Sequence, residues 1–318
     1  MGNRVPSQIP PRPPLVKGGW GGLWNHLFPV SSFALFLCAS AASSLLLPVR
    51  LDAAELIQKI VEYKTVPGDY GIIISGKLGV DWSHIAKENG LNPDAPLPKG
   101  QLLRVKFRRI VPETMENGII INIPDRTLYR FEGERLKDYY FIAAGKPTWQ
   151  TPLGDFVIKA KAKNPTWYVP PSIQKEMEEE GKEILVEVPP GAENPLGKYW
   201  LQLSIKGVGL HGTNAPQSIY KFRSHDCMRL RPEIAELLFR EVPVGTPGRI
   251  IYKPVKMVKA QNGKVFLEVY KDFYKMGINY PEEVERILKE INAVNDVDWS
   301  KIEEGIKAKD GIVRDVTK

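Results

Sequence analysis

A cysteine with two histidines close to it is the part of this sequence best suited to chemistry. The chain has 318 residues and two cysteines, Cys38 and Cys227, and Cys38 lies inside an apolar segment. His225 stands two residues before Cys227, and His211 stands sixteen residues before it (227 − 211 = 16). An imidazole that takes the thiol proton turns cysteine into a strong nucleophile. The spacing therefore predicts a nucleophilic thiol at Cys227 with a histidine as its base.

The competing interpretation is that Cys227 is a small buried hydrophobe, as most free cysteines are. Its neighbours argue against an apolar surrounding, because Ser224, His225, Asp226 and Arg229 are all polar or charged. A cation at Arg229 is expected to lower the thiol pKa, whereas a carboxylate at Asp226 is expected to oppose that effect.

These residues resemble a family signature. The chain reads His211-Gly212-Thr213-Asn214 and then Ser224-His225-Asp226-Cys227-Met228-Arg229-Leu230. This pattern is similar to that of the L,D-transpeptidase catalytic domain, also called the YkuD domain. The usual motif has glycine where this chain has Asp226. Aspartate tolerates a positive φ better than most residues, so we expect the site to remain active.

The resemblance implies a role for each residue of the site. Cys227 is the nucleophile, and His211, rather than His225, is the general base and acid. The carbonyl of Gly212 fixes the His211 tautomer, and the backbone N–H groups of His225, Asp226 and Cys227 hold the oxyanion. Substrate-shaping roles fall to Thr213, Asn214 and Ser224, and Arg229 binds a substrate carboxylate or braces the loop. No cofactor and no metal is implied.

The reaction implied by the resemblance is acyl transfer between peptidoglycan stem peptides. A donor stem loses its terminal D-Ala and forms a thioester on Cys227, and an acceptor amine then takes the acyl group. Water as acceptor would make the protein an L,D-carboxypeptidase. The residues leave two more functions open, a non-catalytic peptidoglycan-binding protein and a metal enzyme using His211, His225 and Cys227, although this last set lacks an evident fourth ligand.

Short β-rich runs with Gly and Pro turns fill residues 116–254, which predicts a mainly β sandwich or barrel for the catalytic domain. Expected strands include 118–123, 127–131, 199–203 and 249–252. The polar segment 174–182 predicts a helix, either a solvated surface helix or a lid beside the catalytic cleft. Trp167 is assigned to the core and not to the site.

Residues 55–110 predict a small α+β unit with a short strand running into a turn over 63–70, a helix at 82–91, and a turn into a second strand over 99–105. Its motifs, such as Tyr63-Lys64-Thr65-Val66-Pro67-Gly68-Asp69 and Gly100-Gln101-Leu102-Leu103-Arg104-Val105, resemble those of a LysM domain, which implies binding of peptidoglycan glycan strands. The alternative is an accessory unit that binds nothing.

The two ends of the chain are less specific. Residues 1–27 are rich in Pro and Gly and predict disorder, and residues 28–49 are apolar and uncharged, as in a signal peptide or signal anchor. An exported protein of the periplasm or cell wall is expected, with membrane attachment limited to an uncleaved anchor in the first 54 residues. Residues 255–318 predict an α/β appendage with a strand at 264–270 and helices at 281–294 and 299–306.

The distribution of charge argues against a nucleic-acid partner. The formal net charge is +7. Residues 1–54 carry four basic residues and one acid, so the remainder carries 40 − 36 = +4. This mild excess suits an anionic polymer such as a cell wall, and no basic run marks a nucleic-acid interface.

Overall fold

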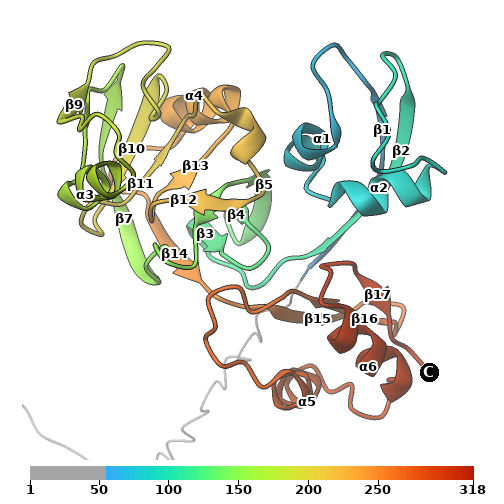
Figure 1. Ribbon diagram of the computed structural model, residues 1–318. Coiled ribbons are helices and arrows are strands. Elements are labelled where there is room, and N and C mark those ends of the chain that lie inside the picture. The colour runs from blue at the N-terminus through green and yellow to red at the C-terminus, as the bar shows by residue number, and fades with distance from the viewer. Residues whose placement is uncertain (1–54) are drawn as a thin grey trace, which may run out of the picture. The chain divides into compact units, whose positions relative to one another are not determined.

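Strands dominate the part of the chain that the computed structural model describes, residues 55–318 (Figure 1). Strands hold 33% of it and helices 22%, so the expected mainly β class is confirmed. The N-terminal disorder, the signal segment and Cys38 lie outside the described residues. Within residues 55–318 no helix has the length and apolar character needed to cross a bilayer.

One eight-stranded sheet forms the central unit. Its strand order is β13-β11-β10-β7-β14-β3-β4-β5. The bounds of these strands are β3 Asn117–Asn122, β4 Thr127–Glu132, β5 Arg135–Phe141, β7 Gly154–Lys163, β10 Tyr199–Leu203, β11 Gly209–His211, β13 Met228–Arg229 and β14 Pro247–Ile251. Two small pairs flank it, β6 (Ala144–Gly145) with β12 (Phe222–Ser224), and β8 (Trp167–Tyr168) with β9 (Glu187–Val188). The four expected strands named above are present, with ends shifted by two residues or fewer.

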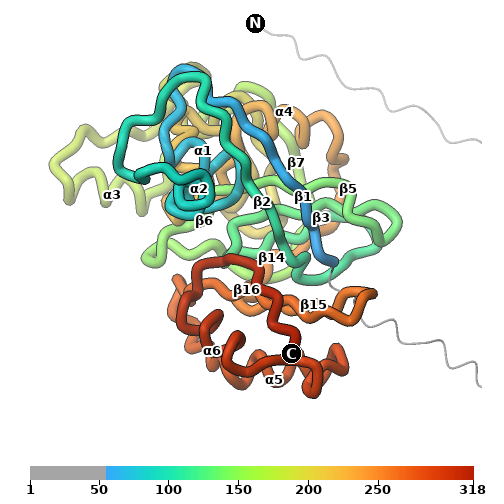
Figure 2. Tube along the Cα trace, turned by 90° about the vertical axis from the view of Figure 1, so that its right-hand side faces the viewer, coloured from blue at the N-terminus to red at the C-terminus, as the bar shows by residue number. Residues whose placement is uncertain are grey.

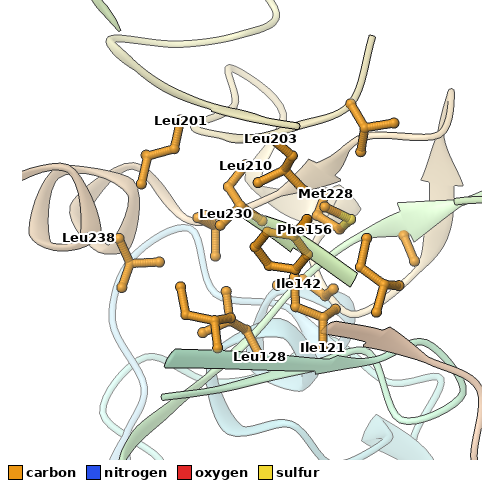
Figure 3. Packing of buried hydrophobic residues seen from close by; sticks show 14 of the residues in the cluster. Ile121, Leu128, Ile142, Phe156, Leu201, Leu203, Leu210, Met228, Leu230 and Leu238 are labelled. Atoms are coloured by element: carbon orange, nitrogen blue, oxygen red, sulfur yellow. The ribbon is translucent and has the colours of Figure 1, made fainter. Parts of the chain in front are cut away.

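The sheet curls around a single apolar core. Side chains from distant strands meet in it, including Ile121 of β3, Phe156 of β7 and Leu210 of β11. Figure 3 shows Phe156 between Ile121 and Leu128 on one side and Leu203 and Leu210 on the other. Strands at opposite ends of one sheet can share a core only when the sheet is bent toward itself. Helix α4 (Pro232–Glu241) packs against β10 and β11 and contributes Leu238 to this core.

The side chains of β3 are buried on both faces of the sheet. Ile119 and Ile121 point into the main core, whereas Ile120 points into a second cluster with Val111 and Tyr129. Successive side chains of a strand alternate between faces, so an uninterrupted run of isoleucines fits a strand that is covered on both sides.

The N-terminal unit differs from the expectation in one element. It comprises β1 (Leu56–Lys64), α1 (Gly71–Leu78), α2 (Trp82–Glu88) and β2 (Leu102–Ile110), and β1 and β2 pair antiparallel along their whole length. The expected short strand running into a turn over 63–70 is present, although the strand begins earlier, at Leu56, and already ends at Lys64. Helix α1 was not expected. Glycine and β-branched isoleucines are weak helix formers, so packing of the fully buried Ile74 must decide this helix.

The C-terminal unit has its own sheet and core. Strands β15 (Val255–Lys259), β16 (Val265–Val269) and β17 (Arg314–Asp315) form a three-stranded antiparallel sheet. Helices α5 (Tyr280–Glu290) and α6 (Trp299–Ala308) pack against β15 and β16 respectively, and Figures 1 and 2 both show them on the same side of the sheet. The predicted strand and both predicted helices are present, and β15 and β17 were not expected.

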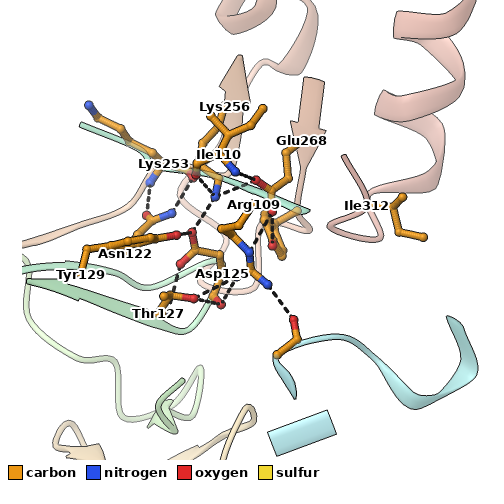
Figure 4. A network of polar contacts seen from close by, with 12 residues as sticks. Arg109, Ile110, Asn122, Asp125, Thr127, Tyr129, Lys253, Lys256, Glu268 and Ile312 are labelled. Atoms are coloured by element: carbon orange, nitrogen blue, oxygen red, sulfur yellow. Dashed lines mark hydrogen bonds and ion pairs between the residues drawn. The ribbon is translucent and has the colours of Figure 1, made fainter. Parts of the chain in front are cut away.

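A buried polar network ties the N-terminal unit, the central sheet and the C-terminal unit together (Figure 4). The Nζ atom of Lys256 lies 2.7 Å from Asp125 Oδ2 and 2.9 Å from Glu268 Oε2. Arg109 Nε lies 3.3 Å from Glu268 Oε1, and the backbone N–H of Ile110 donates to Glu268 Oε2 over 2.8 Å. Since buried charges are tolerated only when they are paired, this network fixes β2 against β15 and β16.

Candidate active site

A cavity of about 540 Å³ opens beside the edge of the eight-stranded sheet. Six residues of the motif line it: His211, Ser224, His225, Asp226, Cys227 and Arg229. The remaining wall is largely aromatic and apolar, and includes Trp149, Trp167, Tyr168, Ile173 and Trp200.

Two short parallel strands bring the two halves of the motif together. In the pairing of β11 with β13, Leu210 is opposite Met228 and His211 is opposite Arg229. Neighbouring strands lie roughly 4.8 Å apart. His211 therefore ends one strand at the place where Cys227 leads into the next.

His211 is held by its own backbone. Its Nδ1 atom lies 2.6 Å from the carbonyl oxygen of Gly212, the contact that the resemblance implies. Since a carbonyl only accepts, Nδ1 carries the proton and Nε2 is left as a base. Burial, followed by the positive charge of Arg229, lowers the His211 pKa to about 4, so the imidazole is neutral near pH 7.

The ring of His211 also packs against an aromatic neighbour. The centroid of the Trp200 ring lies 5.7 Å from that of His211. Trp200 occupies the space beside Gly209, where an added Cβ would lie 2.4 Å from its ring. The lack of a side chain at Gly209 thus allows Trp200 to support the base.

The Cys227 thiol is less acidic than the sequence predicted. Its Sγ lies 3.4 Å from the carbonyl oxygen of Gly207. Burial, then the carboxylate of Asp226, raises the pKa of the Cys227 thiol well above its usual value, and Arg229 lowers it by less. The expected lowering by Arg229 is therefore outweighed, because burial penalises the charged thiolate.

The loop before Cys227 uses N–H groups that were expected to hold an oxyanion. The N–H of Asp226 donates to the carbonyl of Trp149 over 3.2 Å, and the N–H of Cys227 donates to the carbonyl of His225 over 2.7 Å. Asp226 has a φ of 59°, in the region that glycine adopts most readily. Two of the three N–H groups expected to hold the oxyanion therefore have carbonyl partners within the protein in this structure.

His225 is turned toward the helical insertion and not toward the thiol. Its Nε2 contacts Glu176 Oε2 on α3 (Pro171–Glu179), and Glu176 Oε1 lies 2.6 Å from Lys146 Nζ. Lys146 first, and His225 second, lower the Glu176 pKa to about 2. Of the two positions considered for this insertion, the structure favours the one beside the cleft, because Ile173 of α3 lines the cavity.

Comparison with known proteins agrees with this geometry. The family model described as the L,D-transpeptidase catalytic domain matches residues 116–255. The "Probable L,D-transpeptidase YbiS" of Escherichia coli is 28% identical, covering 89% of this chain and 95% of its own. The "Probable L,D-transpeptidase YcfS" of Escherichia coli is 30% identical, covering 76% of this chain and 79% of its own. This chain belongs to the L,D-transpeptidase family.

Solved structures of the family cover less of the chain. The crystal structure of the Enterococcus faecium L,D-transpeptidase is 21% identical, with a TM-score of 0.33, and the match covers 42% of this chain and 49% of that chain. The present chain thus spans about half the length of that solved chain. Membership of the L,D-transpeptidase family assigns the protein an acyltransferase activity in cell-wall cross-linking, with peptidoglycan as substrate.

Two residues expected in the L,D-transpeptidase cleft do not line it. Thr213 is buried, and its Oγ1 accepts the backbone N–H of Ala215 over 3.0 Å. The Asn214 side-chain amide donates to the carbonyl of Glu193 over 3.2 Å. Both side chains fix the loop after His211 and are not among the residues that line the cavity, so any part they have in shaping the cleft is through this loop.

The remaining two expected binding residues do face the L,D-transpeptidase cavity. The Ser224 hydroxyl donates to the carbonyl of Cys227, which braces the turn. Arg229 lines the cavity, and among residues 55–318 its guanidinium forms no ion pair with an acid. Within residues 55–318, Arg229 therefore forms no structural salt bridge.

Sequence reasoning missed the aromatic wall of the cavity. Trp167 was assigned to the core, yet it is only partly buried and lines the cavity together with Trp149 and Trp200. The signal was available in part, because tryptophan is rare and an aromatic pair follows the Asn164-Pro165 turn. Within residues 55–318, no cluster of three or more metal-binding side chains was found.

Proposed function

We propose that Cys227 is the nucleophile of this L,D-transpeptidase and that His211 is its general base and acid. The observation that carries this proposal is the placement of His211, whose Nδ1 is held by the Gly212 carbonyl and which lines the same cavity as Cys227. A base must be unprotonated and within reach of the proton that it takes.

The two pKa shifts support a first step in which proton transfer accompanies the attack of sulfur. A high thiol pKa and a low imidazole pKa disfavour a resting thiolate–imidazolium pair. The thiol proton therefore moves to His211 as sulfur attacks the donor carbonyl. The S–C bond forms, the C–N bond to the terminal D-Ala breaks, and His211 returns the proton to the leaving amine.

Arg229 is the proposed anchor for the donor. The leaving D-Ala ends in a carboxylate, and a guanidinium forms paired hydrogen bonds to such a group. A guanidinium that lines the cavity and forms no ion pair within residues 55–318 is suited to this role. After burial, its charge is the second cause of the lowered His211 pKa.

In the second step an amine of another stem attacks the thioester. The C–N bond of the cross-link forms, the C–S bond breaks, and the amine proton passes through His211 to the released sulfur. Water in place of the amine would release a tripeptide, and the protein would then act as a carboxypeptidase.

We also propose roles for the two segments that precede the catalytic domain, one in binding the cell wall and one in export. The N-terminal unit is proposed as a LysM-like module that binds glycan strands, supported by its Gly-Asp and Gly-Gln motifs and by its two strands enclosing two helices. The apolar segment 28–49 is proposed to direct export to the periplasm or cell wall. Sedimentation of residues 55–318 with purified sacculi, and its competition by chitin oligosaccharides, tests the glycan-binding role.

Product analysis tests the proposed function. Residues 55–318 are incubated with a disaccharide tetrapeptide that carries diaminopimelate, with Cys227→Ala as control. A dimer that lacks one D-Ala and that is absent with Cys227→Ala is the expected result. Tripeptide without dimer would make the protein a carboxypeptidase, and no product with retained binding to sacculi would favour a non-catalytic binding protein.

A further inference from the structure

The carboxylate of Asp226 lines the reaction cavity. Among the ion pairs of residues 55–318, none includes Asp226. The imidazole of His225, on the same loop, contacts Glu176, and burial, which raises the Asp226 pKa, outweighs the electrostatic influence of His225 on this carboxylate. A partly buried carboxylate without a cation is unfavourable, because burial removes its hydration.

The position of this carboxylate is fixed by the backbone. The N–H of Asp226 donates to the carbonyl of Trp149 over 3.2 Å, and the residue adopts a φ of 59°. Its side chain interacts with the Cys227 thiol. The carboxylate therefore stands beside the sulfur that will carry the acyl group.

Acylation changes the group beside the Asp226 carboxylate. The Cys227 thiol, whose Sγ lies 3.4 Å from the Gly207 carbonyl oxygen in the free enzyme, has a proton to donate, whereas a thioester sulfur has none. At that stage the next reactant, an amine, must approach the carbonyl carbon bonded to the sulfur. An amine arrives at neutral pH mainly as an ammonium ion, and an ammonium is the group that a free carboxylate attracts.

We propose that Asp226 docks the ammonium group of the acceptor stem and so favours cross-linking over hydrolysis of the thioester. This inference rests on the proposed function, because it needs an acyl group on Cys227. The docked ammonium first loses one proton to water and becomes an amine. During the attack the amine loses a second proton to His211, and His211 passes this second proton to the departing thiolate of Cys227. The aromatic wall formed by Trp149 and Trp167 can cover the apolar stem of such a side chain.

The proposal explains why this chain has aspartate where the family motif has glycine. The carboxylate raises the thiol pKa and so makes the first step harder. In return, it provides a recognition group for the second step. A residue that opposes acylation and assists transfer has opposite effects on the two half-reactions, which no purely structural role would produce.

The test uses Asp226→Asn, which has the same shape and tolerates a positive φ. Acyl-enzyme is formed from the tetrapeptide donor and followed by intact mass, and it is then divided between dimer and tripeptide at increasing acceptor concentration. Asp226→Gly, which restores the family motif, serves as the second variant. Asp155→Asn, which removes an exposed carboxylate of β7 paired with Arg249, controls for the change in net charge.

Asp226→Asn is expected to form the thioester at least as fast as the wild type but to lose about tenfold in the ratio of dimer to tripeptide, the effect of one charge-assisted hydrogen bond. Hydroxylamine, a nucleophile that is uncharged at neutral pH, should cleave the thioester of both proteins equally.

An unchanged ratio of dimer to tripeptide in Asp226→Asn would overturn the inference alone, and so would an equal loss with hydroxylamine. A wild-type protein that forms no thioester would overturn the proposed function together with the inference. The two failures are thus distinguishable in one experiment.

Discussion

His211 and Arg229 are directly opposite each other on the parallel strands β11 and β13. This register places a guanidinium next to the base, and the charge adds to burial in lowering the His211 pKa. The same strand pair delivers Cys227 to the cavity. One short parallel pairing therefore sets the position of the base and, after burial, contributes to keeping it unprotonated.

The low pKa of His211 predicts a pH-dependent stability. The folded state favours the neutral imidazole, so stability is complete above the unfolded pKa of about 6.5 and falls as the pH drops through that value toward about 4. The loss corresponds to about 3 kcal/mol for this single group. Urea denaturation of wild type and His211→Gln at pH 7 and pH 4 should show that the wild type loses more, and parallel pH profiles would contradict the assignment.

Arg229→Gln should weaken donor binding. Without the guanidinium the donor carboxylate loses a charge-assisted pair, so the KM for the tetrapeptide should rise about tenfold or more. Arg229→Lys is the matched control, because it keeps the charge and loses the planar fork. An unchanged KM in both variants, measured by the initial rate of D-Ala release, would remove Arg229 from the site.

Gly209→Ala should disturb the base without unfolding the protein. The new Cβ would lie 2.4 Å from the Trp200 ring, and the displaced ring packs on His211. Overpacking of this kind costs about 1–3 kcal/mol, and the rate of acylation should fall together with the melting temperature.

The double variant Gly209→Ala with Trp200→Ala distinguishes steric strain from other causes. Because the clash requires the indole ring, adding Gly209→Ala to Trp200→Ala should cause little further loss. Additive losses of acylation rate in the double variant would show that Gly209 does not act through Trp200.

Lys256→Met should destabilise the packing of β2 against β15 and β16. It leaves the buried carboxylates of Asp125 and Glu268 facing each other without their shared cation, a change that costs about 3–5 kcal/mol. Lys264→Met removes an exposed pair with Asp315 and should cost no more than about 1 kcal/mol. Comparable losses in chemical denaturation would mean that the buried network contributes no more than a surface pair.

The parts of the site that the sequence predicted are those with local signals. The cysteine, its histidine and the turn between them lie within one short segment, and the strand pattern around His211 implies its place at a strand end. The positive φ of Asp226 followed from the glycine that the family motif has there.

The parts that the sequence did not predict depend on contacts between distant segments. Glu176 meets His225 across 49 residues, and no local pattern in either segment encodes that contact. The same applies to Trp149, which accepts from the Asp226 N–H. Helix α1 was missed because packing of Ile74, and not its weak helix propensity, determines its structure.

Intact mass spectrometry of the protein after mixing with the tetrapeptide donor tests the central claim most directly. A mass increase equal to the donor minus D-Ala, located at Cys227 by peptide mapping and strongly delayed in His211→Gln, is the predicted result. An adduct at another residue, or unchanged kinetics in His211→Gln, would contradict the assignment of Cys227 as nucleophile and His211 as base.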